Sequence, residues 1–461
     1  MQELTIKKII EITDGKLING DESQIIDGFS KDTRTIKKGD LYIGIKGEKL
    51  DGNTYYKDAF EKGAIACLLD NDKLDKNELN KFKNIILVKN SIKAIQEIAK
   101  YKRNLYNIPV IAVTGSVGKT STKDMIASIL KQKYNVLKTE GNNNNHIGLP
   151  LTLLKLKEHN AIVVEMGMNH LGEIRILTNI AKPNICVITN IGTSHIGNLG
   201  SRENILKAKL EILEGIQEGG TLIINNDNDL LHEWHKNNEK DYDIKTYGIK
   251  NESTYMAEDI KLEEEKSNFD ILIEGKKYNI TVPVPGEPFI YNSLCGIAIG
   301  KLLNINMNNI LDGIKNLELT KKRMEILKTK EGIKIINDTY NASLDSVKPA
   351  IEQLKIINGN KKIAVLGNML ELGEYSKELH EKVGEELVKN KIDILITVGD
   401  LAKYIAEKSS NLGMKTDCIF SFENLQQAIK KIKDIKKEGD VILLKASNSM
   451  HFNEIAEELM K

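Results

Sequence analysis

The chain of 461 residues lacks any apolar run of 18 residues, so the sequence offers no segment that could span a membrane. Its four cysteines are widely scattered and form no C-x-x-C pair. This spacing argues against a disulfide framework or a zinc site and predicts reduced core thiols, as in the cytoplasm. The formal net charge is only +1, which argues against bulk attraction to nucleic acid or anionic membranes. We therefore expect a cytoplasmic protein with no nucleic-acid partner and no membrane span.

The bulk composition is that of an ordinary globular protein, with 41% hydrophobic and 28% charged residues. A chain of this length is expected to form about three domains. No internal repeat marks the boundaries, so they are placed where the pattern changes. The resulting domains are residues 1–104, 105–318 and 319–461.

Residues 105–318 carry short buried-strand signals, "PVIAVTG", "AIVVEMG", "ICVITNIG" and "GTLIINND", with helical segments between several of them. Continuous apolar strands that alternate with helices indicate a parallel sheet covered on both faces. Residues 250–283 are typical of antiparallel strands, and two helices are expected at 292–303 and 307–316. After 319 the alternation restarts, which predicts a second doubly wound unit.

The predicted fold class is therefore α/β with three domains. A small mixed α/β N-terminal domain precedes a central domain with a P-loop-type parallel sheet, and a Rossmann-like domain follows.

The stretch "VTGSVGKTST", residues 113–122, holds the strongest chemical signal. A strict P-loop, G-x-x-x-x-G-K-[ST], requires a glycine at position 113, where the chain has Val113. A glycine-bearing turn between a strand and a helix still brings backbone amides and the helix N-terminus onto a phosphate. Lys119 is expected to neutralise the phosphates of ATP, and Thr120 to offer its hydroxyl to Mg²⁺. The expected nucleotide-binding residues here are Gly115, Ser116, Gly118, Lys119, Thr120 and Ser121.

Two further polar side chains follow strands of the same predicted sheet. Glu165 ends "AIVVE", and His195 lies in the loop "TNIGTSHIGNLGS". In an open α/β sheet these strand ends face the ligand crevice, and a carboxylate oxygen suits Mg²⁺. Read alone, the first could be a helix cap and the second an ordinary loop histidine. Together they are candidates for the metal and the catalytic centre.

Several ordered strings resemble the Mur ligase family over nearly the whole chain. They include "TGSVGKTSTK", "GNNNNHIGLPLTLL", "EMGMNHLGEI", "TNIGTSHIGNLGSRENILKAKLEIL" and "NMLELG". The resemblance implies an ATP-dependent amide ligase that phosphorylates the carboxylate of a UDP-N-acetylmuramoyl-tripeptide. The amine of D-Ala-D-Ala then attacks the acyl phosphate, in the cytoplasmic synthesis of peptidoglycan precursors. "EMGMNHLGEI" and "NMLELG" favour this dipeptide-adding reaction.

The resemblance also assigns roles to single residues. It implies that Mg²⁺ binds at Thr120 and Glu165, that a second cation lies near His195, and that Lys209 is carbamylated and serves as a magnesium ligand. By the same likeness Asn292 contacts adenine, Arg323 reaches the phosphates and Asp338 binds ribose. The N-terminal domain is expected to bind the UDP-sugar, and the C-terminal domain the incoming amine, in a monomer. The expected substrate-binding residues are Thr33, Arg34, Lys46, Gly47, Asn144 and Asn145.

Four positions depart from the family pattern: Pro288, Ser343, Asn368 and Asn448. Because of these departures, a ligase that uses a different amine acceptor stays an open alternative. Other open alternatives are the tripeptide-forming Mur ligase, a folylpolyglutamate synthase and a nucleotide-binding paralogue without catalysis. A P-loop motor or GTPase is disfavoured, because those proteins usually keep the full P-loop spacing.

Overall fold

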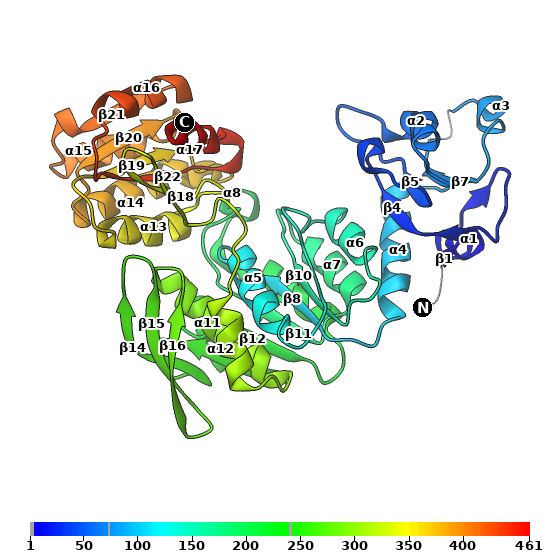
Figure 1. Ribbon diagram of the computed structural model, residues 1–461, viewed down its shortest axis with the longest axis horizontal. Helices are drawn as coiled ribbons and strands as arrows, with labels where there is room; N and C mark the ends of the chain where they lie inside the picture. The colour runs from blue at the N-terminus through cyan, green and yellow to red at the C-terminus, as the bar shows by residue number, and fades with distance from the viewer. Residues whose placement is uncertain (1–3, 72–73, 239–241) are drawn as a thin grey trace.

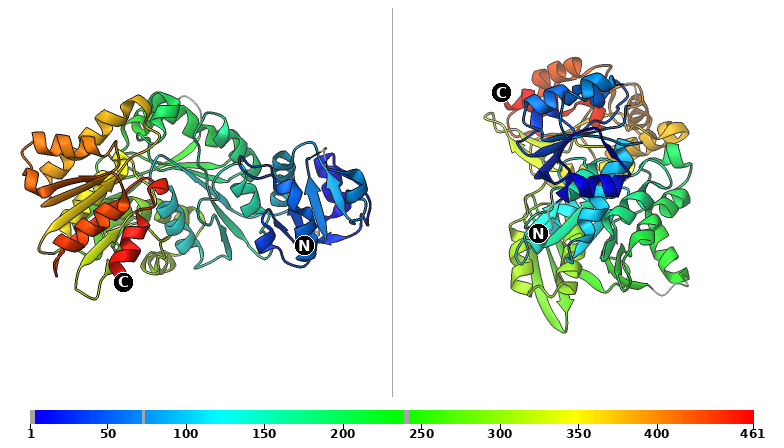
Figure 2. Two further views of the ribbon diagram at one scale, coloured as in Figure 1. Left: turned by 90° about the horizontal axis from the view of Figure 1, so that it is seen from above. Right: turned by 90° about the vertical axis from the view of Figure 1, so that its right-hand side faces the viewer.

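The computed structural model describes residues 4–71, 74–238 and 242–461, and these form three lobes in a row (Figures 1 and 2). The first lobe contains a five-stranded sheet in the order β2-β7-β6-β5-β4 and a two-stranded pair, β1-β3. Helix α4 (Ser91–Asn104) leads from this lobe into the second. The other elements are β1 (Leu4–Thr5), α1 (Ile6–Thr13), β2 (Lys16–Leu17), β3 (Ile25–Ile26), β4 (Gly28–Ser30), β5 (Asp40–Ile43), α2 (Tyr56–Glu61), β6 (Ala66–Leu69), α3 (Lys76–Leu79) and β7 (Ile85–Leu87).

The second lobe is built on a nine-stranded sheet in the order β16-β15-β14-β13-β12-β11-β8-β10-β9. Strands β8 to β13 are parallel, and β14 to β16 form the antiparallel extension expected for residues 250–283. The strands are β8 (Val110–Thr114), β9 (Val136–Lys138), β10 (Ala161–Glu165), β11 (Ile185–Ile188), β12 (Thr221–Asn225), β13 (Asp243–Gly248), β14 (Tyr255–Leu262), β15 (Ser267–Ile273) and β16 (Lys276–Val282).

Helices cover both faces of this sheet, as the apolar strands predict. Helices α5, α11 and α12 pack together on one face, and α4, α6 and α7 on the other. Helix α11 begins five residues earlier than expected, because Gly286 (φ 108°) turns the chain and Pro288 fits the first helical turn. The helices are α5 (Lys119–Leu130), α6 (Gly148–Leu153), α7 (Glu173–Ala181), α8 (Ile196–Leu199), α9 (Arg202–Leu210), α10 (Asp229–Asn237), α11 (Glu287–Leu302) and α12 (Met307–Lys315).

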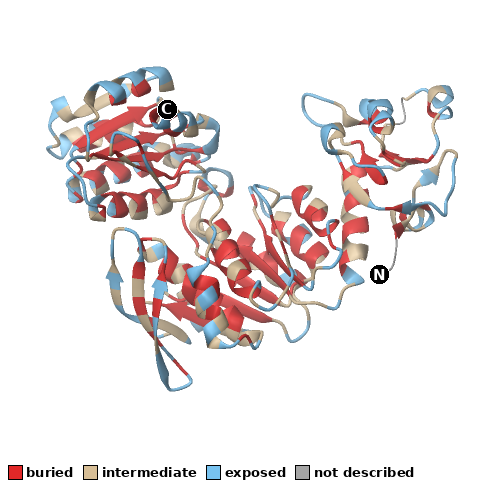
Figure 3. Ribbon diagram, in the orientation of Figure 1, coloured by how far each residue is buried: buried red, intermediate tan, exposed pale blue. Residues whose placement is uncertain are grey.

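The third lobe has a six-stranded sheet in the order β17-β18-β22-β19-β20-β21, parallel except for β17. The four inner strands β18, β22, β19 and β20 are almost wholly buried between helices, whereas the edge strands β17 and β21 are partly exposed (Figure 3). The α/β class of the chain is thus confirmed. The elements are β17 (Glu325–Lys328), β18 (Lys334–Asn337), α13 (Leu344–Ile356), β19 (Lys362–Gly367), α14 (Ser376–Lys389), β20 (Ile394–Val398), α15 (Lys403–Asn411), β21 (Ile419–Phe422), α16 (Leu425–Ile435), β22 (Val441–Lys445) and α17 (Asn453–Met460).

Within the described ranges, none of the helices combines the length and hydrophobicity that crossing a bilayer requires. All four cysteines are free thiols; Cys67, Cys186 and Cys295 are buried, and Cys418 is partly exposed. Burial raises the pKa of the three buried thiols, so they are core residues with little nucleophilic character.

Candidate active site

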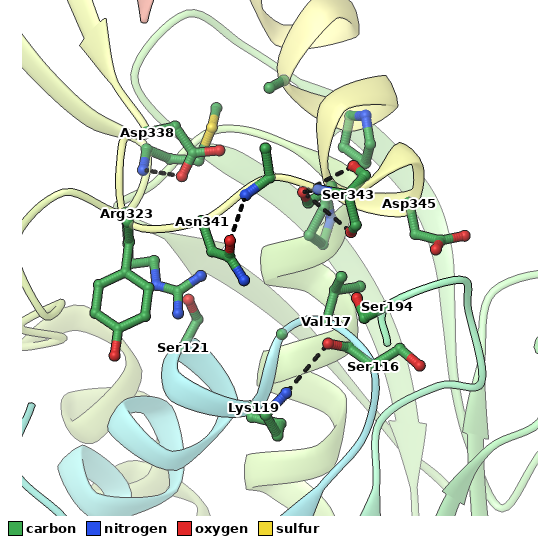
Figure 4. Close-up of a pocket in the computed structure, with 18 of the residues that line it drawn as sticks. Ser116, Val117, Lys119, Ser121, Ser194, Arg323, Asp338, Asn341, Ser343 and Asp345 are labelled. Atoms are coloured by element: carbon green, nitrogen blue, oxygen red, sulfur yellow. Dashed lines mark hydrogen bonds between the residues drawn. The ribbon is translucent and has the colours of Figure 1, made fainter. Parts of the chain in front are cut away.

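A pocket of about 370 Å³ lies between the second and third lobes. Figure 4 shows Lys119 and Ser116 of the central loop facing Ser343 and Asp345 of the C-terminal lobe. Most of the residues predicted from the sequence line this pocket. They are Ser116, Gly118, Lys119, Ser121, Asn144, Asn145, Glu165, His195, Asn292, Arg323 and Asp338.

The glycine-bearing turn joins β8 to α5 at the carboxyl end of the central sheet. Gly115 has φ 146°, and a Cβ there would lie 1.9 Å from Thr189 Oγ1, so a side chain does not fit. Lys119 Nζ donates to the carbonyl oxygens of Gly115 (2.8 Å) and Ser116 (3.1 Å). Burial lowers the pKa of Lys119. The two hydrogen bonds hold Lys119 Nζ against the loop at the N-terminus of α5, where an anion can be bound.

Glu165 is held at the end of β10 by two donors. Thr120 Oγ1 donates to its Oε2 over 2.9 Å, and Asn144 Nδ2 donates to its Oε1 over 2.7 Å. Arg323 of the third lobe reaches across and donates to Thr120 Oγ1 over 3.1 Å. The hydroxyl and the carboxylate thus form a small oxygen site beside the loop, as Mg²⁺ requires.

Lys209 lies on α9 with its side chain completely buried, and its Nζ has no hydrogen-bond partner. Burial, together with the positive charge of Lys119, lowers its pKa well below the usual value. A neutral amine can react with CO₂ to give a carbamate, whereas an ammonium cannot. Within the described residues no cluster of three or more His, Cys, Asp or Glu side chains could hold a metal. Thr120 and Glu165 supply few oxygen ligands by themselves. A carbamate on Lys209 would add a further anionic oxygen, which suits Mg²⁺.

His195 connects the central lobe to the third lobe. It has φ 64° just before α8, and its Nδ1 lies 2.6 Å from Oε2 of Glu371. The close contact with His195 lowers the pKa of the Glu371 carboxyl. Nearby, Asp345 accepts from the backbone N (2.7 Å) and Oγ1 (2.8 Å) of Thr193. These bonds hold the two lobes together over the pocket.

Two predicted nucleotide ligands have partners of their own. Asn292 Oδ1 accepts from Thr122 Oγ1 over 2.8 Å. Asp338 is paired with the buried Lys445 at the end of β22. Sequence reasoning missed Lys445. The signal was present, because Lys445 in "VILLKAS", like Glu165, is a charged residue at the end of a buried strand.

The guanidinium of Arg323 lies 3.8 Å from the centre of the Tyr340 ring. This stacking fixes the arginine between the lobes. Tyr340, Asp345 and Glu371 were also missed, because only packing between distant segments brings them to the site.

A second cavity of about 480 Å³ adjoins the first and shares His195, Tyr340 and Ser343 with it. Asn448 lines this cavity and donates from Nδ2 to the carbonyl oxygen of Tyr340 over 3.0 Å. Asn368 lines neither cavity; its Oδ1 accepts from the backbone N of residues 401 and 402. Of the four departures, Asn368 is thus a structural residue of the third lobe, and Pro288 lines the first cavity.

The N-terminal candidates Thr33, Arg34, Lys46 and Gly47 lie in the first lobe and line neither cavity. The Arg34 side chain is 84% exposed and pairs with Asp32 at 2.6 Å. Their role in binding the UDP-sugar stays a prediction.

Family models match three successive parts of the chain. They are described as Mur ligase family, catalytic domain (residues 26–103), Mur ligase middle domain (113–300) and Mur ligase, glutamate ligase domain (322–448). A UDP-N-acetylmuramoyl-tripeptide–D-alanyl-D-alanine ligase from Bacillus subtilis is 39% identical, covering 100% of this chain and 99% of that protein.

Solved structures agree with these matches. MurF from Acinetobacter baumannii superposes with a TM-score of 0.88 at 27% identity, covering 100% of this chain and 99% of that one. MurF ligase from Thermotoga maritima in complex with ADP gives a TM-score of 0.81 at 27% identity, covering 94% and 97%. The full-length likeness, the loop over β8 and the pocket between the lobes agree, and the chain belongs to the Mur ligase family.

Proposed function

We propose that this protein is an ATP-dependent ligase that joins D-Ala-D-Ala to UDP-N-acetylmuramoyl-tripeptide during peptidoglycan precursor synthesis. The observation that carries the proposal is the pocket between the lobes, with a phosphate loop on one side and Arg323 and Asp338 on the other. The B. subtilis relative, named for this reaction, is similar over the full length of the chain. An acceptor cavity directly beside the nucleotide pocket suits a two-step transfer.

The first step needs two anions to approach each other. The tripeptide carboxylate attacks the γ-phosphorus of ATP, the bond to the β–γ bridging oxygen breaks, and an acyl phosphate and ADP result. Lys119 and Arg323 face this position from opposite lobes and offset the charge repulsion. Closure of the lobes over the pocket keeps water from the acyl phosphate.

We propose that Mg²⁺ binds at Thr120 and Glu165, with a second cation near His195 and with carbamylated Lys209 as a further magnesium ligand. When bound, the ion supplies positive charge to the phosphate oxygens. Asn144 orients Glu165 through its 2.7 Å hydrogen bond, and this fixes one carboxylate oxygen while leaving lone pairs free. Carbamylation of the buried Lys209 converts an orphaned amine into a carboxylate-like anion.

The second step takes place in the adjoining cavity. The free amine of D-Ala-D-Ala attacks the acyl carbon, phosphate leaves, and the amine loses a proton. The carbonyl of Asn341 already accepts a hydrogen bond from Lys445, whereas Ser343 and Asn448 present neutral polar groups to the acceptor. Lysine and arginine are absent from the described lining of this cavity, so the acceptor's carboxylate is left to His195 and to neutral donors such as Ser343 and Asn448.

We further propose the division of labour among the three domains. Residues 1–104 bind the UDP-sugar through Thr33, Arg34, Lys46 and Gly47, with Asn145 nearer the peptide. Residues 105–318 bind ATP, where Asn292 contacts adenine and Asp338 of residues 319–461 contacts ribose. The enzyme is expected to act as a cytoplasmic monomer.

The test is phosphate release from ATP and Mg²⁺ with UDP-N-acetylmuramoyl-tripeptide and a series of acceptors, with product masses read in the same tubes. The series comprises D-Ala-D-Ala, D-Ala-D-Ser, D-Ala-D-Lac and single amino acids. Turnover that requires D-Ala-D-Ala supports the proposal. Turnover with another acceptor instead would support the ligase reaction but replace D-Ala-D-Ala as the substrate. ATP binding without any turnover would refute the proposed ligase activity.

A further inference from the structure

Gln353 is a buried polar side chain that none of the steps above uses. It lies on α13 of the third lobe, is 1% exposed and lines the nucleotide pocket. Neither its Oε1 nor its Nε2 has a hydrogen-bond partner. A buried amide with both groups unsatisfied destabilises the protein unless a ligand supplies the partners.

The position of Gln353 along α13 sets it apart from the start of the helix. Ser343, which precedes the helix, borders both cavities, and the pocket then follows the helix past Ser346 and Pro349 to Gln353. Ten residues of helix span about 15 Å. The amide therefore lies about 15 Å along the helix from Ser343, on the side of the pocket formed by Gly286.

This side of the pocket has the character of a site for a flat aromatic ring. Its walls are apolar, while Asn292 already uses its Oδ1 to accept from Thr122. Gly286 leaves room for the Gln353 amide, since a Cβ there would lie 3.3 Å from Oε1. The apolar lining residues on this side are Pro285, Pro288 and Phe289, which flank Gly286, and Pro349 and Ala350, one turn before Gln353 on α13.

We propose that Gln353 binds the amino edge of adenine. Its Oε1 accepts from the exocyclic amino group, and its Nε2 donates to the neighbouring ring nitrogen. These two bonds satisfy both orphaned atoms at once, and the burial of the Gln353 side chain strengthens them. The inference rests on the proposed use of ATP and adds a base contact from the third lobe to the expected one from Asn292 in the second.

The experiment compares wild type with Gln353→Met, which keeps the side-chain length and removes both polar atoms. Gln427→Met is the matched control, because Gln427 is an exposed helical glutamine in the same lobe. KM and kcat are measured with ATP and with purine riboside triphosphate, which lacks the amino group. Inosine triphosphate is less useful, because a free amide can turn over and match its reversed edge. Melting temperature is measured without nucleotide.

Gln353→Met should raise KM for ATP about tenfold and leave kcat within about twofold. Wild type should prefer ATP to the purine analogue by about fivefold, and the variant should show no preference. The melting temperature of the variant should be equal to or above that of wild type, because no protein contact is lost.

An unchanged preference for ATP over the analogue would overturn the inference. So would a fall of several degrees in melting temperature, or failure to fold, because both would show that the amide has a structural partner. If wild type shows no turnover, the proposed function fails instead, and the same nucleotide preference is then read from ligand-induced shifts in melting temperature.

Discussion

The two faces of the nucleotide pocket are built in different ways. On the central face, Lys119, Thr120 and Glu165 are held by partners in their own lobe. On the C-terminal face, Asp345 and Glu371 are bonded to residues of the opposite lobe. Apart from the bond from Arg323 to Thr120, the first face is therefore assembled within one lobe, whereas Asp345 and Glu371 join the site only when the lobes meet. Substitutions on the central face should therefore mainly lower kcat, whereas substitutions of residues that join the lobes should mainly raise KM for ATP, with smaller effects.

The largest effect is expected at the preassembled face, from Lys119→Met. Loss of the loop cation should reduce kcat about a thousandfold or more, because the developing charge on the transferred phosphoryl group loses its fixed counterion. Phosphate release measures the effect. Lys131→Met is the control, since Lys131 is exposed at the other end of the same helix. A loss confined to KM for ATP would contradict a role in the transition state.

Lys209→Met should reduce kcat about a hundredfold while leaving the melting temperature nearly unchanged, because Nζ has no partner to lose. In wild type, ¹³C-bicarbonate should give a carbamate resonance by ¹³C NMR that is absent from the variant. The exposed Lys207, two residues earlier on α9, provides the control Lys207→Met. An identical spectrum for wild type and Lys209→Met would rule out the carbamate at this position.

A smaller effect, on KM for ATP rather than on kcat, is expected from Asp345→Ala. It removes two bonds between the lobes, so KM for ATP should rise about tenfold while kcat changes less than about threefold. Small-angle scattering with bound nucleotide should show a larger radius of gyration than for wild type. Glu352→Ala, at an exposed position on the same helix, should change neither quantity. If Asp345→Ala lowered kcat alone, closure would not be its function.

The smallest effect is expected in the acceptor cavity, from Asn448→Arg. A cation added to a lining without lysine or arginine should lower KM for D-Ala-D-Ala about threefold by attracting its carboxylate. The same substitution at the exposed Asn411 is the control. A higher KM would show that the acceptor does not place its carboxylate near position 448.

The central face could be predicted because its signals are local in the sequence. The loop around Lys119 lies directly between a buried strand and a helix, and Glu165 and His195 follow other strands of the same sheet. Short edge strands such as β17 could not be predicted, because four residues are too few to establish a hydrophobic pattern in the sequence.

The C-terminal face could not be predicted in this way. The bond between Asp345 and Thr193 joins residues 152 positions apart, and no spacing rule relates them. The unpartnered state of Lys209 and Gln353 is equally invisible in the sequence, since a helical lysine or glutamine is ordinarily solvated. These features come from packing of distant segments, so only the structure reveals them.

The placement of the pocket between two lobes has a consequence for the timing of each turnover. We expect ADP bound between groups of both lobes to leave more readily once the contacts of Asp345 and Glu371 across the gap are broken. We therefore expect an opening step in each catalytic cycle, and where that step is slow it sets kcat. We expect a compound that bound both faces together to inhibit by holding the lobes closed and keeping substrate out, whatever its resemblance to the reactants.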